Sequence, residues 1–256
     1  MSIEDPTVAK LADTLGAATL ELDNDPIQLL DTEEAVARVT GELLAAGTPV
    51  AVDFEGRDLC RAGKLDLMQL SDGKRTWLVD VTTLGETAFG AGARALLESE
   101  AVLKVGFDGR GDADALWHLH KTMLTNVYDV QIASCKRQDA TEGRRDRVVH
   151  GLGRAMDAFL RGDRARQATM AVVKDAGRKL FAPELGGSYD VWAERPLSAT
   201  LIEYAGNDVA LLLEMREAWE RYSPTDTNVN ISRERIRKAV QGQRPAKGKQ
   251  MALKDF

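Results

Sequence analysis

The spacing of apolar residues in the first third of the chain predicts one helix followed by three strands. Val36, Val39 and Leu43 recur at helical spacing within residues 33–46, and Asp31-Thr32 precedes them as a cap. Three short apolar runs then have the length of strands, namely Val50–Phe54, Leu65–Leu70 and Trp77–Val81. Because Asp72-Gly73 is a tight-turn signal between the last two, we expect an antiparallel meander.

The rest of the chain alternates short strands with helices. Strands are predicted at Val102–Gly106 and Val127-Tyr128. Apolar residues at helical spacing predict helices over residues 86–98, 129–136, 151–160, 169–180 and 197–222. A further helix is predicted to begin at Arg110. This order predicts an α/β fold with a mixed sheet flanked by helices.

Composition divides the chain into three parts. We expect an N-terminal extension with a helix over residues 1–47, a main domain over 48–225 and a basic, flexible tail over 226–256. From residue 231 to the end, eight Lys or Arg residues stand against two acids, although the whole chain of 256 residues has a net charge of −6. The body is therefore acidic, which argues against a wide basic surface.

The cysteines and the lengths of the apolar runs indicate the cellular compartment. Cys60 and Cys135 show neither the spacing of a zinc site nor a disulfide framework, which favours a reducing environment. Apolar runs stay shorter than a membrane span, and the first residues lack a signal-peptide pattern. We expect an intracellular protein of the cytoplasm or nucleus that does not contact a membrane.

Two acids at the end of the first strand are the main chemical signal. Asp53 and Glu55 are two positions apart, so they project from the same side of the strand, while Phe54 packs on the other. Two neighbouring carboxylates repel each other, and burying an unpaired charge is costly. A divalent cation between them would remove both penalties.

Later segments supply further acids. Tyr204 and Asp208 share one face of the helix predicted over 197–222, one turn apart. The junction between the strand at 102–106 and the next helix offers three acids: Asp108, Asp112 and Asp114. Four carboxylates from separate segments suit Mg²⁺ or Mn²⁺, and two such ions can clamp both oxygens of a phosphodiester displacement.

These motifs resemble the DEDDy-type 3′–5′ exonucleases of the ribonuclease D superfamily. Asp-x-Glu matches Asp53 and Glu55, the second motif places its ligand at Asp112, and Tyr-x-x-x-Asp matches Tyr204 and Asp208. The phrases NVYDVQIA and KLFAPELGGSYDVWAERPL look closest to the Egalitarian/EXD-like, fungal-type group. Phe107 departs from the family pattern, in which a polar residue often precedes the second motif.

The resemblance implies a ribonuclease H-like fold with a five-stranded mixed sheet, three strands antiparallel and the others parallel. It implies that Asp53 bridges two Mg²⁺ or Mn²⁺ ions, with Glu55 and Asp208 at the first and Asp112 at the second. Tyr204 would orient the attacking water. The implied substrate is a single-stranded nucleic acid with a free 3′ end, degraded to nucleoside 5′-monophosphates. The four carboxylates should therefore converge, with the Tyr204 hydroxyl at their rim.

Two other functions remain open on the sequence. A catalytically weak or inactive adaptor on the same fold could bind nucleic acid or protein, although an adaptor is free to lose the acids that this chain keeps. An oligoribonuclease-like activity is disfavoured because that branch has a histidine where this chain has Tyr204. RNA is favoured over DNA by the RNA-linked resemblance, and the oligomeric state stays open.

Overall fold

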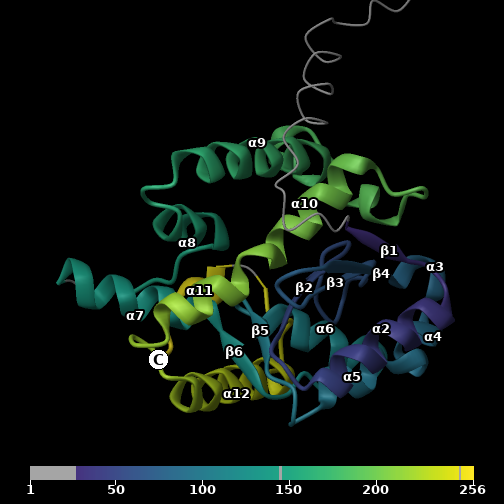
Figure 1. Ribbon diagram of the computed structural model, residues 1–256, viewed down its shortest axis with the longest axis horizontal. Coiled ribbons are helices and arrows are strands. Elements are labelled where there is room, and N and C mark those ends of the chain that lie inside the picture. Colours follow the sequence, from purple (N-terminus) through teal and green to yellow (C-terminus); the bar gives the residue numbers. More distant parts are fainter. Residues whose placement is uncertain (1–26, 144–145, 248) are drawn as a thin grey trace, which may run out of the picture.

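The computed structural model describes residues 27–143, 146–247 and 249–256, and a mixed sheet lies at its centre (Figure 1). In this part of the chain the sheet has six strands in the order β1-β4-β3-β2-β5-β6. The strands are β1 (Gln28–Leu30), β2 (Val50–Glu55), β3 (Leu67–Ser71), β4 (Thr76–Asp80), β5 (Lys104–Gly106) and β6 (Val127–Asp129). Strands β2, β3 and β4 are antiparallel, whereas β5 pairs parallel with both β2 and β6.

Helices cover both faces of this sheet. The longer ones are α2 (Glu33–Ala46), α6 (Arg110–His120), α7 (Val130–Glu142), α8 (Leu152–Phe159), α9 (Arg164–Phe181), α10 (Ala199–Ala210), α11 (Leu212–Trp219) and α12 (Thr225–Gln241). The shorter ones are α3 (Val81–Leu84), α4 (Glu86–Ala88) and α5 (Arg94–Glu98). Helices α10 and α11 lie over one face, and α2, α5, α6 and α12 lie over the other (Figure 1).

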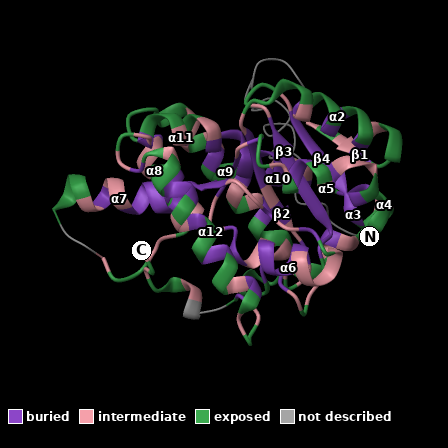
Figure 2. Ribbon diagram, turned by 90° about the horizontal axis from the view of Figure 1, so that it is seen from below, coloured by how far each residue is buried: buried purple, intermediate pink, exposed green. Residues whose placement is uncertain are grey.

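The apolar core is split by the sheet into two layers. Val52, Phe54 and Met68 face the α2 side, whereas Ala51, Leu67 and Leu78 face α10 and α11. Figure 2 shows the buried strands between helices whose outer faces are exposed. None of the helices in the described ranges combines the length and apolar character of a membrane span.

The predicted α/β architecture is confirmed, but the expected count of five strands is wrong by one. Strand β1 adds to the edge of the sheet, with Gln28–Leu30 pairing parallel to residues 77–79 of β4. Three residues are too few to show the alternation of apolar and polar positions that marks a strand, so no strand was predicted at Gln28–Leu30. The rest of the segment at 1–26 lies outside the described residues.

Two predicted helices are interrupted. The segment at 86–98 contains a turn of π-helix at Phe89–Ala93. Gly92 within it has φ 130°, and a Cβ at this position would also stand 2.2 Å from the Thr40 hydroxyl of α2. The segment at 197–222 divides at Leu211 into α10, which contacts β2, β3 and β4, and α11, which contacts β5 and β2. This division places Asp208 in the last turn of α10.

The expected flexible tail over 226–256 is wrong for most of its length. Residues 225–241 form α12, which packs against α6 and β6. Arg235 of this helix is buried, and its guanidinium pairs with Asp129 at the end of β6 and with Asp255, at 2.9 Å from the latter. The basic segment is therefore folded, because its Arg235 forms an ion pair with the buried Asp129.

Candidate active site

Strand β2 presents the first two acids to the α10 face of the sheet. Val52 and Phe54 enter the core on the α2 side, so the alternation of the strand turns Asp53 and Glu55 to the opposite face. Their strand pairs with β3 over residues 51–55, with Asp53 directly opposite Gln69. The predicted shared orientation of the two acids follows from this register.

Helix α10 brings the third acid. Ser198 caps the helix by accepting a hydrogen bond from the Leu201 amide. Before the cap, Arg195 of the Trp-x-x-Arg-Pro-Leu motif makes a two-pronged ion pair with buried Asp80 of β4, each N–O distance being 2.6 Å. The start of α10 is thereby fixed to the sheet, and Asp208 near its end reaches β2.

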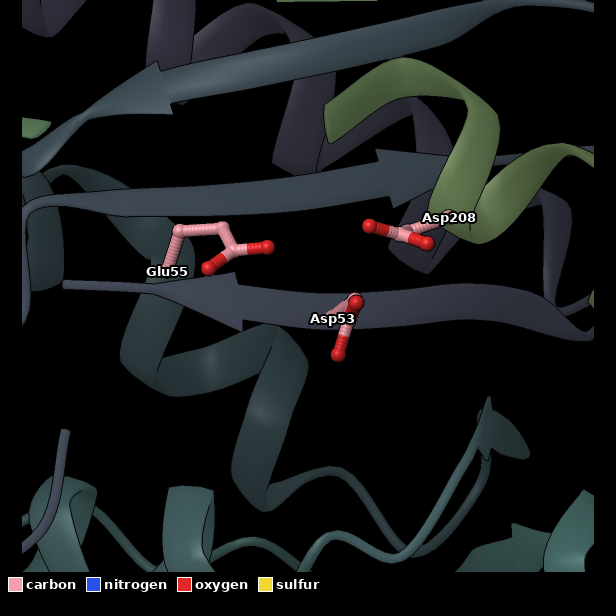
Figure 3. A group of neighbouring side chains, drawn as sticks. All are labelled: Asp53, Glu55 and Asp208. Carbon is pink, nitrogen blue, oxygen red and sulfur yellow. The ribbon is translucent and has the colours of Figure 1, made fainter. Parts of the chain in front are cut away.

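Asp53, Glu55 and Asp208 form a compact group, which we call the three-acid group. One carboxylate oxygen from each residue lies within 4.8 Å of the others. Figure 3 shows Glu55 and Asp208 pointing toward each other over β2, with Asp53 between them along the strand. Three of the four predicted acids are therefore brought together from segments far apart in the sequence.

The fourth acid, Asp112, is near this group but outside it. It stands in the first turn of α6. Burial raises the pKa of Asp112 well above its usual value, and the charges of Asp53, Asp108 and Glu55 raise it further. Asp112 therefore interacts electrostatically with Asp53 and Glu55, although it is not a member of the three-acid group.

Burial makes the three-acid group costly to ionise. The pKa of Asp53 is raised to about 6 by burial, against the opposing effect of Lys174. Burial and the charge of Asp53 together raise the pKa of Glu55 to about 8. Such values indicate that the cluster needs a cation to hold all its charges near neutral pH.

Tyr204 lies at the same site, within an aromatic cluster. Its ring meets Phe181 edge-on at a centroid distance of 5.1 Å and Trp192 at 6.1 Å. Burial raises the pKa of the Tyr204 hydroxyl, and the charges of Glu55 and Asp53 add to that effect. The Tyr204 phenol therefore lies near these two acids, and its role toward an attacking water stays a prediction.

A lysine that the sequence analysis did not select enters the site from α9. The Lys174 ammonium pairs with Asp208 and lies 4.3 Å from the centre of the Tyr204 ring. Met170, Lys174 and Gly177 share one face of α9, and the other two are buried. A lysine in such an apolar stripe is a signal that could have identified it.

The other acids of the second motif have structural partners. Asp108 pairs with Arg110 at 2.5 Å and accepts a hydrogen bond from Gln131. Asp114 is fully buried and binds the Arg61 side chain, with Nε at 2.8 Å from its carboxylate. Both acids are therefore paired with arginine side chains of their own.

The residues present fit a hard divalent cation. The three-acid group offers only oxygen donors, which Mg²⁺ and Mn²⁺ prefer. Beside it, the Gln69 side chain opposite Asp53 is fully buried, and within the described ranges neither of its polar atoms has a hydrogen-bond partner. Buried polar atoms without partners are rare and indicate a missing ligand or water.

Comparison with known proteins agrees with this geometry. A family model described as 3′–5′ exonuclease matches residues 27–221. The mouse piRNA biogenesis protein EXD1 is 29% identical over 172 residues, which cover 65% of this chain and 28% of the mouse protein. The chain spans about a third of the length of the curated relatives that it matches.

Solved structures of RNase D share the fold. In complex with GMP, RNase D from Trypanosoma brucei superposes with a TM-score of 0.65 at 22% identity, covering 87% of this chain and 66% of the other. The same enzyme in complex with RNA U12 gives a TM-score of 0.64 at 20% identity, covering 93% and 77%. The expected ribonuclease H-like fold is thereby confirmed.

Proposed function

Because the chain belongs to the 3′–5′ exonuclease family, as a DEDDy-type, RNase D-like domain, we propose that it removes nucleotides from the 3′ end of single-stranded nucleic acid. The products would be nucleoside 5′-monophosphates. The observation that carries the proposal is the three-acid group, because its oxygens from β2 and α10 lie within 4.8 Å of one another. RNA is the favoured substrate, since the relatives include EXD1, named for piRNA biogenesis, and an RNase D solved with RNA.

Each site residue has a distinct role in this proposal. Asp53, Glu55 and Asp208 would hold the first divalent ion, and Asp53 with Asp112 would hold the second. The neutral Tyr204 hydroxyl orients the attacking water, because its raised pKa keeps the proton on the phenol. Bound Mg²⁺ or Mn²⁺ supplies a nucleophile near neutral pH and stabilises the leaving 3′ oxygen.

An arginine-lined pocket between α7 and α8 supports nucleic-acid binding. Arg137, Arg154 and Arg161 line it, and Glu142 and Asp157 in the same lining offset part of their positive charge. Guanidinium groups suit phosphate oxygens, so we infer that these arginines contact the backbone of the substrate. Binding through it should weaken steeply as salt is raised.

A degradation assay tests the proposal. End-labelled single-stranded RNA, single-stranded DNA and duplexes with a 3′ overhang are incubated with the full chain and Mg²⁺ or Mn²⁺. We expect stepwise shortening from the 3′ end, with RNA cut fastest, and its loss in Asp53→Asn. Asp175→Asn removes an exposed acid of α9 and should act like the wild type. No shortening by the wild type, or equal shortening by Asp53→Asn, contradicts the proposal.

One observation favours a non-catalytic alternative, in which the domain binds nucleic acid without cutting it. The Lys174 ammonium already neutralises Asp208, so the site has a cation of its own. Under this alternative the wild-type chain would retain labelled RNA in a filter-binding assay with no shortening at millimolar Mn²⁺. Shortening that depends on Asp53 would exclude it.

A further inference from the structure

Lys174 stands where a cation is needed. Its ammonium pairs with Asp208, whose side chain is 3% exposed, while the lysine side chain itself is 18% exposed. It also interacts electrostatically with Asp53 and Glu55. One lysine therefore faces all three members of the three-acid group.

The packing of α9 against α10 fixes this position. One turn beyond Lys174, Gly177 lies against the Tyr204 ring so closely that an added Cβ would stand 2.4 Å from the ring carbon Cδ2. This close approach brings the Lys174 ammonium over the face of the same ring, at 4.3 Å from its centre. The lysine is thus held between the acids and an aromatic face, which both attract a cation.

Other cations near the end of α9 are disposed differently. Lys179 pairs with Asp175 at 2.6 Å, and Arg178 pairs with Glu184 at 3.4 Å. All four of these side chains are more than half exposed. Lys174 is therefore distinguished from its neighbours by its burial and by a partner in the three-acid group.

A divalent ion and the ammonium cannot share the group. Mg²⁺ binds its oxygen ligands at about 2.0–2.1 Å, so an ion bound to the Asp208 oxygen that pairs with Lys174 would overlap the ammonium. Like charges at that separation repel strongly where water is scarce. Ion binding must therefore displace the Lys174 side chain from Asp208.

We propose that Lys174 is a built-in competitor of the divalent cation and sets the metal affinity of the three-acid group. The inference rests on the proposed metal-dependent function. In the absence of metal, Lys174 neutralises part of the group and keeps the site assembled. When metal binds, the lysine is released toward the opening of the site, and the cost of its release lowers the affinity.

Titration of the chelator-treated full chain with Mn²⁺, followed by calorimetry, tests the competition. Lys174→Met removes the charge at similar volume and should tighten Mn²⁺ binding by about tenfold or more, the scale of coupling between linked ligands. Lys179→Met removes an exposed cation of the same helix and should leave the affinity unchanged. Lys174→Gln, which can still hydrogen-bond to a carboxylate, replaces Lys174→Met if that protein does not fold.

The outcomes separate this inference from the proposed function. Equal or weaker Mn²⁺ binding by the neutral variants, with measurable binding by the wild type, overturns the competition alone. Absence of Mn²⁺ binding in every variant overturns both the competition and the metal-dependent function. Tighter binding in Lys174→Met and Lys174→Gln, together with its loss in Asp208→Asn, supports both.

Discussion

Asp53 and Glu55 hold their carboxylates within 4.8 Å of each other on one strand of a buried sheet. Burial and this proximity raise the pKa of Glu55 to about 8 from an ordinary 4.5. The folded, metal-free protein therefore keeps a proton on Glu55 that the unfolded chain releases. This difference links the site to the stability of the whole domain.

We expect the metal-free protein to lose stability as the pH rises from about 4.5 to 8. Between these values the folded state binds more protons than the unfolded state, so the free energy of unfolding falls. The loss should be at least about 1 kcal/mol, because one pKa unit corresponds to about 1.4 kcal/mol. Urea denaturation at both ends of the range measures it. Glu55→Gln, which cannot ionise, should flatten the slope, and an unchanged slope in that variant would contradict the assignment.

Asp112→Asn should separate metal binding from cleavage. Because Asp112 lies outside the three-acid group, the first Mn²⁺ should still bind with nearly wild-type affinity. Shortening of labelled RNA should nevertheless fall by about 10²-fold or more, the usual loss when transition-state charge stabilisation is removed. Calorimetry measures the Mn²⁺ affinity and the degradation assay measures the cleavage rate, both on the same preparation. If Asp112→Asn cuts as fast as the wild type, Asp112 has no part in catalysis.

Tyr204→Phe should lower the rate without unfolding the protein. The substitution keeps the ring that packs on Gly177, Phe181 and Trp192 and removes only the hydroxyl. The catalytic rate should drop by about 10²-fold, the lower range for a positioned proton-handling group. Single-turnover kinetics and thermal unfolding measure the two effects. A large fall in melting temperature would instead assign the hydroxyl to structure.

Arg235→Ala should destabilise the domain by about 3–5 kcal/mol, because it leaves buried Asp129 without its ion-pair partner. Arg237→Ala provides the matched control on the same helix, since Arg237 is exposed and pairs with neighbouring Glu234 and Gln241. Its effect should stay within about 0.5 kcal/mol. Urea denaturation compares the three proteins, and similar midpoints for both variants would show that the Arg235–Asp129 ion pair contributes little to stability.

Local sequence patterns were sufficient to predict the strand that carries Asp53 and Glu55, the helix that carries Tyr204 and Asp208, and the β3–β4 hairpin. The alternation in β2 oriented Asp53 and Glu55, and the one-turn spacing in α10 put Tyr204 and Asp208 on one face. The tight turn at Asp72-Gly73 gave the β3–β4 hairpin. These features depend on neighbouring residues, so the sequence carries them directly.

Features that depend on distant partners were missed. Arg235 is polar in sequence, and only its contact with Asp129, more than a hundred residues earlier, makes it a core residue. Lys174 was likewise not selected, because its pairing with Asp208 depends on the packing of α9 against α10. The distance of Asp112 from the three-acid group also depends on how α6 follows β5, which residue spacing does not fix.

The attachment of α12 has a consequence for the order of folding during synthesis. Arg110, at the start of α6, donates a hydrogen bond to the carbonyl of Met251, and Asp108 and Asp129 both face Arg235. The loop that carries the second motif is thus tied to residues that are synthesised more than a hundred positions after it. We expect the sheet and α10 to assemble earlier and this loop to become protected from hydrogen exchange only after α12 docks. A nascent chain halted before α12 would accordingly hold the three-acid group but not an ordered Asp112.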